Sequence, residues 1–441
     1  MKKEKILQNK KLYMEHLKGK KLLVLGGLAL ECEIVARAQE MGIYVIVADY
    51  NPNVPARKYA DRFELISATD VPALVELCKK EKIDGVTTGF IDILMQPCYD
   101  VCKELGLPCY FTPKMLSMST NKVDFKETCT KYGIPVPKTY FIGEQIPDDI
   151  YGEVCYPVFV KPLDASGSRG AAICNNKEEL NKYFAEAVSY SVTKNALIED
   201  YITGREFLMN FIAQDGEFRM ISMFDRYACS DRGGAMNYAN LAIGPSKAVN
   251  YYLNEVNDKV ANMFKSLGFK DGLYFLQGFS NGDKIVFYEM GCRLGGSYYD
   301  LEEKCIGIDP VKMTVKYALT GKMTDDIQSM PINIGNYNNI GVCINYLLIS
   351  GENTIDKITG IKEISDMKSF VKCEQRLFEG DSYNTHRIVD WPIFSVYSAV
   401  DNIEQVINDV NYMNSVFGVY NKDGKSLLKE KFNPELLKSL R

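Results

Sequence analysis

Short apolar segments alternate with helix-length segments over residues 22–89, and this alternation constrains the fold more than any other feature of the chain. Between the apolar segments, apolar residues recur at helical spacing. Strands that alternate with helices form parallel sheets. We therefore predict a doubly wound, Rossmann-like α/β domain over residues 21–115, preceded by an N-terminal arm over residues 1–20. The strand-like segments are LLVLGG (22–27), YVIVAD (44–49), FELIS (63–67) and DGVTTG (84–89).

The first strand-to-helix turn, residues 26–31, is similar to a dinucleotide-binding turn. Asp49 ends the second strand about 20 residues after Gly26, as ribose-binding acids do. The turn lacks the third glycine of the GxGxxG pattern, however. Nicotinamide binding is therefore not favoured.

The pattern changes after residue 110. Residues 121–140 are typical of a helix that ends at Gly133 and two prolines, which marks a boundary between structural units. Later strand-like segments are joined by Asp215-Gly216 and by Asn281-Gly282, which are typical of antiparallel hairpins. The predicted fold class is therefore α/β plus α+β. After the first domain we expect two α+β lobes, over residues 116–205 and 206–330, and a C-terminal α+β domain over residues 331–441; the resemblance described below implies that the first lobe is a lid and the second is catalytic.

The composition argues against several kinds of chemistry. The chain has only two histidines, His16 and His386, too few for most zinc sites and for Ser-His-Asp mechanisms. None of the 13 cysteines stands in a CxxC pair, and Cys98 and Cys102 are expected to be buried thiols. A net charge of −5 gives no sign of a nucleic-acid partner, and no apolar run is long enough for a membrane span. We expect a cytoplasmic protein that relies on lysine, arginine and carboxylates.

Lys161 ends the apolar segment VFVK (158–161) and is followed by a loop that contains Ser166, Gly167 and Ser168. Such a loop lets backbone N–H groups approach an anion closely. A lysine charge beside a flap of this kind suits a triphosphate. An ordinary surface hairpin is the alternative for this stretch taken alone.

The stretch IEDYITGREF (198–207) offers a second possible nucleotide contact. An apolar strand leads into Glu199, and the connection through Tyr201 and Ile202 could offer backbone groups to an adenine edge. Glu206, seven residues after Glu199, could accept both ribose hydroxyls. Glutamates at strand ends are usually only solvated, so this signal is weak alone.

Glu289 is the only carboxylate inside the apolar segment KIVFYEMG (284–291), so we expect it to have a cation partner. Gln277, on the facing segment, could supply an oxygen to the same ion, and oxygen-only ligation suits Mg²⁺ held against phosphates. A two-residue loop would place Gln277 and Glu289 on opposite faces, because side chains alternate along a strand. Shared ligation therefore requires a loop with an odd number of residues, such as a three-residue turn with a glycine bulge. Arg293, just beyond, could meet a phosphoryl group or a carboxylate.

Together these elements resemble the ATP-grasp superfamily over roughly residues 22–300. The resemblance matches Lys161 to the lysine before the flap and Lys122 to a second phosphate-binding lysine near the start of the lid. It also matches IEDYI to the adenine hinge, Glu206 to the ribose acid, and the strands of Gln277 and Glu289 to the metal-binding pair. The implied cofactors are ATP and Mg²⁺. The implied chemistry is phosphoryl transfer to a carboxylate, with Lys161 and Arg293 as catalytic residues.

The resemblance implies a ligase that joins a small-molecule carboxylate to an amine, with amino-acid-like substrates as the first expectation. Arg226 and Arg232, in a loop expected over residues 225–246, are candidates for holding a substrate carboxylate. Dimers are common in the superfamily, so a homodimer is a possible assembly.

Two departures from the superfamily pattern keep alternatives open. Gln277 stands where many members have an acid, as in carbamoyl phosphate synthetases, which favours a carboxy-phosphate or carbamoyl-forming enzyme. Gly291 stands where many have asparagine, which favours a nucleotide-binding protein without turnover.

Overall fold

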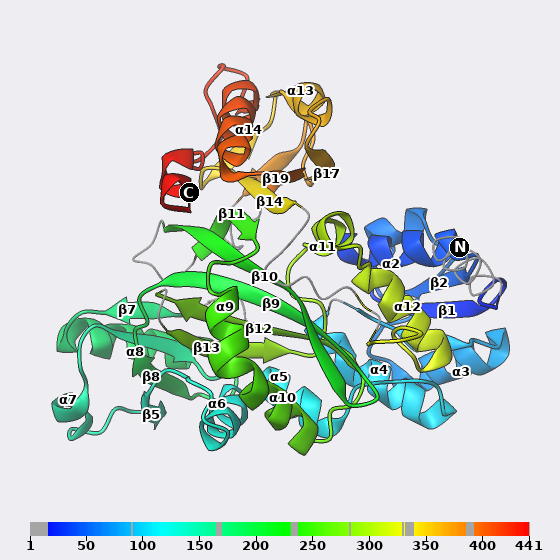
Figure 1. Ribbon diagram of the computed structural model, residues 1–441, viewed down its shortest axis with the longest axis horizontal. Coiled ribbons are helices and arrows are strands. Elements are labelled where there is room, and N and C mark those ends of the chain that lie inside the picture. The colour runs from blue at the N-terminus through cyan, green and yellow to red at the C-terminus, as the bar shows by residue number, and fades with distance from the viewer. Residues whose placement is uncertain are drawn as a thin grey trace.

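The structure is a computed structural model that describes residues 16–89, 91–164, 170–230, 237–281, 284–328, 330, 339–384 and 392–440. Figure 1 shows the N-terminal domain, in blue, and the lid, in teal, on opposite sides of a central green sheet, with the C-terminal segment, in orange and red, at the top. Within these described ranges, none of the helices combines the length and apolar character needed to cross a membrane.

The N-terminal domain is the predicted parallel α/β unit. Its strands lie in the order β3 (Arg62–Glu64), β2 (Tyr44–Ala48), β1 (Lys21–Leu25) and β4 (Gly85–Thr87), and each neighbouring pair is parallel. Four of the five residues of β1 are buried, as expected for a strand that helices cover on both faces. Cys98 and Cys102 are buried, as predicted. The other elements of this domain are α2 (Ala29–Glu40), the 3₁₀ turn η1 (Pro55–Lys58), α3 (Val71–Glu81) and α4 (Asp92–Leu105).

Glu31 lies on α2 at the place where a dinucleotide-binding turn has its third glycine. Its side chain is fully buried, and neither carboxylate oxygen has a hydrogen-bond partner. Burial raises the pKa of Glu31 to about 8. The glutamate therefore fills space that a third glycine would leave open for close helix-to-strand packing.

The lid begins with two helices, α5 (Pro113–Thr120) and α6 (Lys122–Lys131). The Asn121 side chain caps α6 by accepting hydrogen bonds from the backbone N–H groups of Val123 and Asp124, and Gly133 (φ +65°) follows the helix, as predicted. An antiparallel sheet follows, in the order β5 (Thr139–Gly143), β8 (Ala196–Asp200), β6 (Val158–Pro162) and β7 (Ala172–Cys174). Helix α8 (Lys177–Tyr190) packs on this sheet, and α7 (Ile150–Glu153) flanks it.

The central sheet is antiparallel and has eight strands. Gln214 pairs with Glu217 across the Asp215-Gly216 turn, so the first predicted hairpin is confirmed. The expected loop over residues 225–246 is wrong, because β10 continues to Ser230 and β11 begins at Asn237. The strand order is β13 (Ile285–Gly291), β12 (Gly272–Ser280), β9 (Arg205–Gln214), β10 (Glu217–Ser230), β11 (Asn237–Gly244), β14 (Ile340–Leu347), β19 (Pro392–Val400) and β17 (Phe370–Gln375).

The C-terminal segment shares this central sheet, because β14 pairs with β11 and is followed in the sheet by β19 and β17. Helix α14 (Ile403–Val416) contributes to a hydrophobic core with β14 and β19. The sheet therefore carries side chains from the catalytic lobe and from the C-terminal segment to a common region. The remaining elements are α9 (Val249–Tyr251), the π-helical turn η2 (Tyr252–Val256), α10 (Asn257–Ser266), α11 (Tyr299–Ile306), α12 (Pro310–Thr320), β15 (Glu352–Thr354), β16 (Lys357–Thr359), α13 (Ile361–Ser365), β18 (Ser382–Asn384), β20 (Gly418–Tyr420) and η3 (Pro434–Leu440).

Candidate active site

Glu199 is a buried carboxylate shared by two lysines. Lys161, at the end of β6, lies with its Nζ 2.6 Å from Glu199 Oε1, and Lys126 contacts the other carboxylate oxygen. Lys126 Nζ also donates to Thr139 Oγ1 at 3.2 Å. All three charged side chains are buried. The Glu199 carboxylate is therefore occupied by the two lysines. The adenine-binding prediction now rests only on the backbone groups of the connection through Tyr201 and Ile202.

Lys126 was not identified from the sequence. It lies one helical turn after Lys122 on α6, so the two ammonium groups share one side of the helix. Burial lowers the pKa of Lys126 to about 7, and burial also lowers the pKa of Lys122 and of Lys161. The four-residue spacing of the two lysines was the available signal.

Glu289 on β13 lies within the electrostatic reach of three cations. Burial raises its pKa, and the positive charges of Lys122, Lys161 and Arg293 oppose that shift. Lys122 Nζ donates to the carbonyl oxygen of Leu163 at 3.3 Å. Leu163 lies two residues after Lys161, where the loop predicted to be the flap begins. The lid lysines therefore act on the charge of the strand-borne glutamate.

Gln277 and Glu289 are direct neighbours across β12 and β13. The pairing ends at Ser280 and Ile285, which leaves four residues in the connection rather than an odd number. A bulge between Gln277 and Gly278 shifts the register, so that Tyr288 is the extra residue on β13. Gln277 and Glu289 therefore lie on the same face of the sheet, as shared ligation requires. The extra residue that puts them there is in strand β13 and not in the loop, where we had predicted it.

Glu206, the candidate ribose acid, lies at the start of β9. Its Oε1 accepts hydrogen bonds from Arg226 Nη1 at 2.9 Å and from the Tyr288 hydroxyl. Burial raises the pKa of Tyr288 well above its ordinary value, so Tyr288 stays a donor. The bulge thus places Tyr288 against Glu206 and leaves Glu289 beside Gln277.

Arg293 forms a two-point ion pair with Asp92 at the start of α4. Its Nε and Nη2 donate to the two Asp92 oxygens at 2.6 and 2.7 Å. Its guanidinium also lies over the Phe275 ring, 5.0 Å from the centroid. A Cβ at Gly291 would come within 2.0 Å of Phe275 Cε1, so packing under Arg293 explains the glycine at this position.

A cavity of about 230 Å³ lies between strands of the central sheet and the C-terminal segment, and its lining does not include Lys122 or Lys161. Gln277, Glu289 and Arg293 line it from the catalytic lobe, together with Arg226. The C-terminal lining residues were not identified from the sequence, because they come from three strands and form no local motif. They are Cys343 and Asn345 on β14, Arg376 just after β17, and Ser395 and Tyr397 on β19.

A buried polar network supports the loop that lines the cavity after Arg293. Asn210 accepts a hydrogen bond from the Gly295 N–H at 2.9 Å and donates to Glu302 Oε1 at 2.8 Å, and Ser222 also donates to Glu302. Burial raises the pKa of Glu302 from its ordinary value of 4.5 to about 7. The network ties α11 and the central sheet to the Gly295 backbone.

For the remaining predicted site residues the structure gives little or no information. Ser166, Gly167, Ser168 and Arg232 lie outside the described residues. Tyr201 and Ile202 are half-buried between β8 and β9. Among the described residues, no group of three or more His, Cys, Asp or Glu side chains could hold a metal ion. Any ion on Gln277 and Glu289 would therefore need further ligands from a bound phosphate or water.

Residues 121–325 match the ATP binding domain of the carbamoyl-phosphate synthase L chain, and residues 22–95 match the N-terminal domain of PylC-like proteins. The first match covers the lid from residue 121 onward, with Lys122 and Lys161, and the strand pair of Gln277 and Glu289. Residues 121–325 therefore form an ATP-grasp domain. The predicted fold class is confirmed.

Known relatives of this ATP-grasp chain act in different reactions. A formate-dependent phosphoribosylglycinamide formyltransferase from Sulfurisphaera tokodaii is 28% identical over 189 residues, which are 42% of this chain and 47% of that protein. The chain thus spans about half the length of that relative.

Two solved structures share the fold of the chain. An L-amino acid ligase from Bacillus licheniformis has a TM-score of 0.73 at 15% identity, with 92% of this chain and 99% of that chain covered. A biotin carboxylase domain dimer from Hydrogenobacter thermophilus, in complex with MgADP and bicarbonate, has a TM-score of 0.72 at 17% identity, with 93% and 91% covered.

Proposed function

We propose that this protein is an ATP-dependent ligase that joins a small-molecule carboxylate to an amine through an acyl phosphate. The observation that carries the proposal is the cavity into which paired Gln277 and Glu289 come together with Arg226, Arg293 and Arg376. Phosphoryl transfer needs mainly positioning and charge neutralisation, which these groups provide without histidine. Amino-acid-like carboxylates are the proposed substrate class.

In this proposal the lid lysines hold the nucleotide. Lys122 and Lys161 contact the triphosphate, and Glu199 fixes Lys161 from behind. The backbone of Tyr201 and Ile202 meets the adenine, and Glu206 meets the ribose. Ser166, Gly167 and Ser168 belong to the flap that excludes water from the acyl phosphate.

The donor set of Gln277 and Glu289 fits Mg²⁺ that arrives with ATP. One carboxylate and one amide oxygen face each other on paired strands, and phosphate oxygens would complete the ligands. When bound, the ion would neutralise charge on the transferring phosphoryl group. Arg293 then lies beside Glu289, where it stabilises negative charge on the acyl phosphate and on the tetrahedral oxyanion.

Gln277 also supports a second candidate, a carboxy-phosphate or carbamoyl-forming enzyme. The biotin carboxylase that shares this fold was solved with bicarbonate, and an amide at the metal position makes the site less anionic. The packing of Gly291 against Phe275 gives that glycine a structural explanation, which weakens the argument for a binder without turnover.

The test is a screen of amino acids and other carboxylates, alone and in pairs with amines, for ADP release with mass detection of products. The proposal predicts ADP release that needs both an acid and an amine and falls at least about 100-fold in Glu289→Gln. Glu217→Gln, a half-buried change on β10 outside the cavity lining, is the matched control. Bicarbonate-dependent ADP release without an amine would favour the second candidate. ATP binding that no acid converts to ADP would contradict both.

A further inference from the structure

The cavity has a second wall that the proposed phosphoryl-transfer groups do not use. Gln277 and Glu289 lie on β12 and β13 at one edge of the central sheet, whereas Asn345, Ser395 and Arg376 belong to β14, β19 and the end of β17 at the other edge. A substrate in the cavity would therefore face the metal-binding strands with one part and the C-terminal strands with another.

Arg376 is the charged group of this second wall. Its Nη1 donates to the Pro392 carbonyl at 3.0 Å and to Ser395 Oγ at 3.2 Å. Ser395 Oγ in turn donates to Asn345 Oδ1 at 2.7 Å, and the Asn345 amide donates to the Ala239 carbonyl at 2.7 Å. The Arg376 side chain keeps 22% of its surface exposed. Its guanidinium is therefore held at the cavity wall by these hydrogen bonds but is not fully buried.

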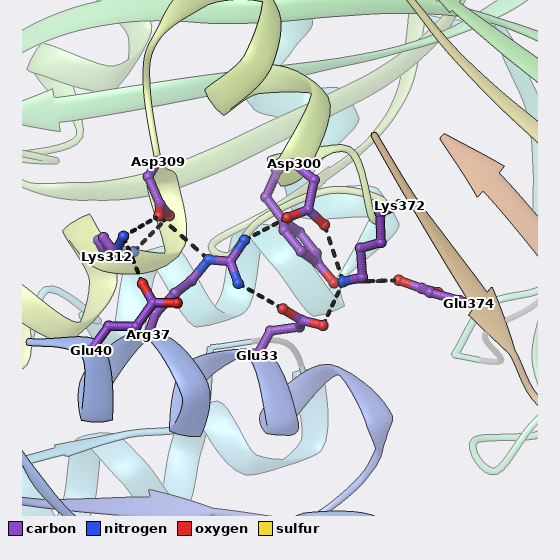
Figure 2. Close-up of polar contacts among 9 residues, drawn as sticks. Glu33, Arg37, Glu40, Asp300, Asp309, Lys312, Lys372 and Glu374 are labelled. Atoms are coloured by element: carbon purple, nitrogen blue, oxygen red, sulfur yellow. Dashed lines mark hydrogen bonds and ion pairs between the residues drawn. The ribbon is translucent and has the colours of Figure 1, made fainter. Parts of the chain in front are cut away.

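A chain of ion pairs holds this wall against the N-terminal domain. Arg376 Nη2 lies 3.2 Å from Glu374 Oε2, and Glu374 Oε1 lies 3.7 Å from Lys372 Nζ. Lys372 also meets Asp300 at 3.1 Å and Glu33 on α2. Figure 2 shows Lys372 between Glu374 and the pair formed by Glu33 and Asp300.

Arg37 extends the chain of ion pairs to a fourth element, the start of α12. It pairs with Glu33 and Asp300, and its Nε lies 3.4 Å from Asp309. The side chains of Figure 2 thus link α2, α11, the start of α12 and β17. The position of Arg376 is therefore set by three parts of the chain and not by a mobile surface loop.

We propose that Arg376, with Ser395 and Asn345, forms a subsite for a second anionic group of the substrate, a carboxylate or a phosphate. A planar guanidinium that lines a cavity suits such a group. The proposal deepens the proposed function, because it makes the ligated carboxylate part of a molecule with at least two anionic groups. It implies that substrates with one carboxylate and no second anion bind weakly.

The test is equilibrium binding by titration calorimetry, which needs no turnover. The full-length protein, with Mg²⁺ and a non-hydrolysable ATP analogue, is titrated with three probes of similar length: butanoate, succinate and 3-phosphonopropionate. At least one dianion should bind about 10-fold more tightly than butanoate. The tighter of the two dianions identifies a carboxylate or a phosphate as the second group.

Two variants make the test specific to Arg376. Arg376→Met should remove the preference for dianions and leave butanoate binding unchanged. Lys312→Met, in the same ion-pair cluster but remote from Arg376 in its contacts, is the control.

Two results would overturn the subsite. They are equal binding of all three probes to the wild type and an unchanged dianion preference in Arg376→Met. Failure of the proposed function would show differently, as dianion binding without ADP release for any acid and amine.

Discussion

The strand pair of Gln277 and Glu289 and the C-terminal strands line the same cavity, but their charges are arranged in different ways. On the first side, Glu289 is one carboxylate under the influence of three cations. On the second side, Arg376, Glu374, Lys372 and Glu33 alternate in sign. Cations from two lobes act on Glu289, although Lys161 and Arg293 are also paired with Glu199 and Asp92, and such a group is suited to receive a polyanion with its metal ion. An alternating chain is suited to hold parts of the fold in place.

The largest expected effect tests the buried charges of the lid. Glu199→Gln should destabilise the protein by about 3–5 kcal/mol, because it leaves Lys126 and Lys161 buried without their shared carboxylate. Chemical denaturation of wild type and variant measures the difference in free energy of unfolding. Glu178→Gln, an exposed change on α8, should stay within about 0.5 kcal/mol of the wild type. A Glu199→Gln protein as stable as that control would show that the lysines do not depend on Glu199.

The next effect tests the buried polar network of Asn210, Ser222 and Glu302, which supports the Gly295 backbone at the cavity. The pKa of Glu302 is about 7 in the folded protein and ordinarily 4.5, so the folded state keeps a proton that the unfolded state releases. Stability should therefore fall as pH rises from about 4.5 to about 7. The glutamine of Glu302→Gln does not titrate, so its stability does not depend on this proton. Its free energy of unfolding relative to the wild type should therefore rise by about 2–3 kcal/mol over that window.

The measurement for Glu302 is the free energy of unfolding of wild type and Glu302→Gln at pH 5 and pH 8. The difference between the two proteins should be larger at pH 8. A difference that is the same at both pH values would contradict the raised pKa.

The smallest effect tests the alternating chain of the second side. Lys372→Met should cost about 1–2 kcal/mol, because Lys372 is partly exposed and solvent screens its pairs with Glu33 and Asp300. Lys312→Met, whose partner Glu40 is more exposed, should cost less than about 0.5 kcal/mol. Thermal unfolding of both variants ranks them. Equal costs would show that the alternating chain does not hold the domains.

The two sides also differ in how much of them the sequence could reveal. The strand-helix alternation, the Asp215-Gly216 hairpin and the segments that carry Lys161 and Glu289 are local patterns, and the structure has the corresponding strands and helices where they were expected. Gln277 and Glu289 face each other because of a bulge at Tyr288, and no residue type in the sequence predicts that bulge. Arg376, Asn345 and Ser395 meet only because β14, β19 and β17 join the central sheet, and such long-range pairing leaves no motif in the sequence.

The central claim is that Lys161, by direct contact, and Glu289, through a bound metal ion, act on one triphosphate. Its most direct test is a double-mutant cycle for ATP binding with Lys161→Met, Glu289→Gln and both changes together, with and without Mg²⁺. With Mg²⁺, each single change should weaken ATP binding by at least about 10-fold and leave AMP binding unchanged, and the double change should deviate from additivity by about 1 kcal/mol. Additive effects that are the same with and without Mg²⁺, or an equal loss of AMP binding, would contradict the claim.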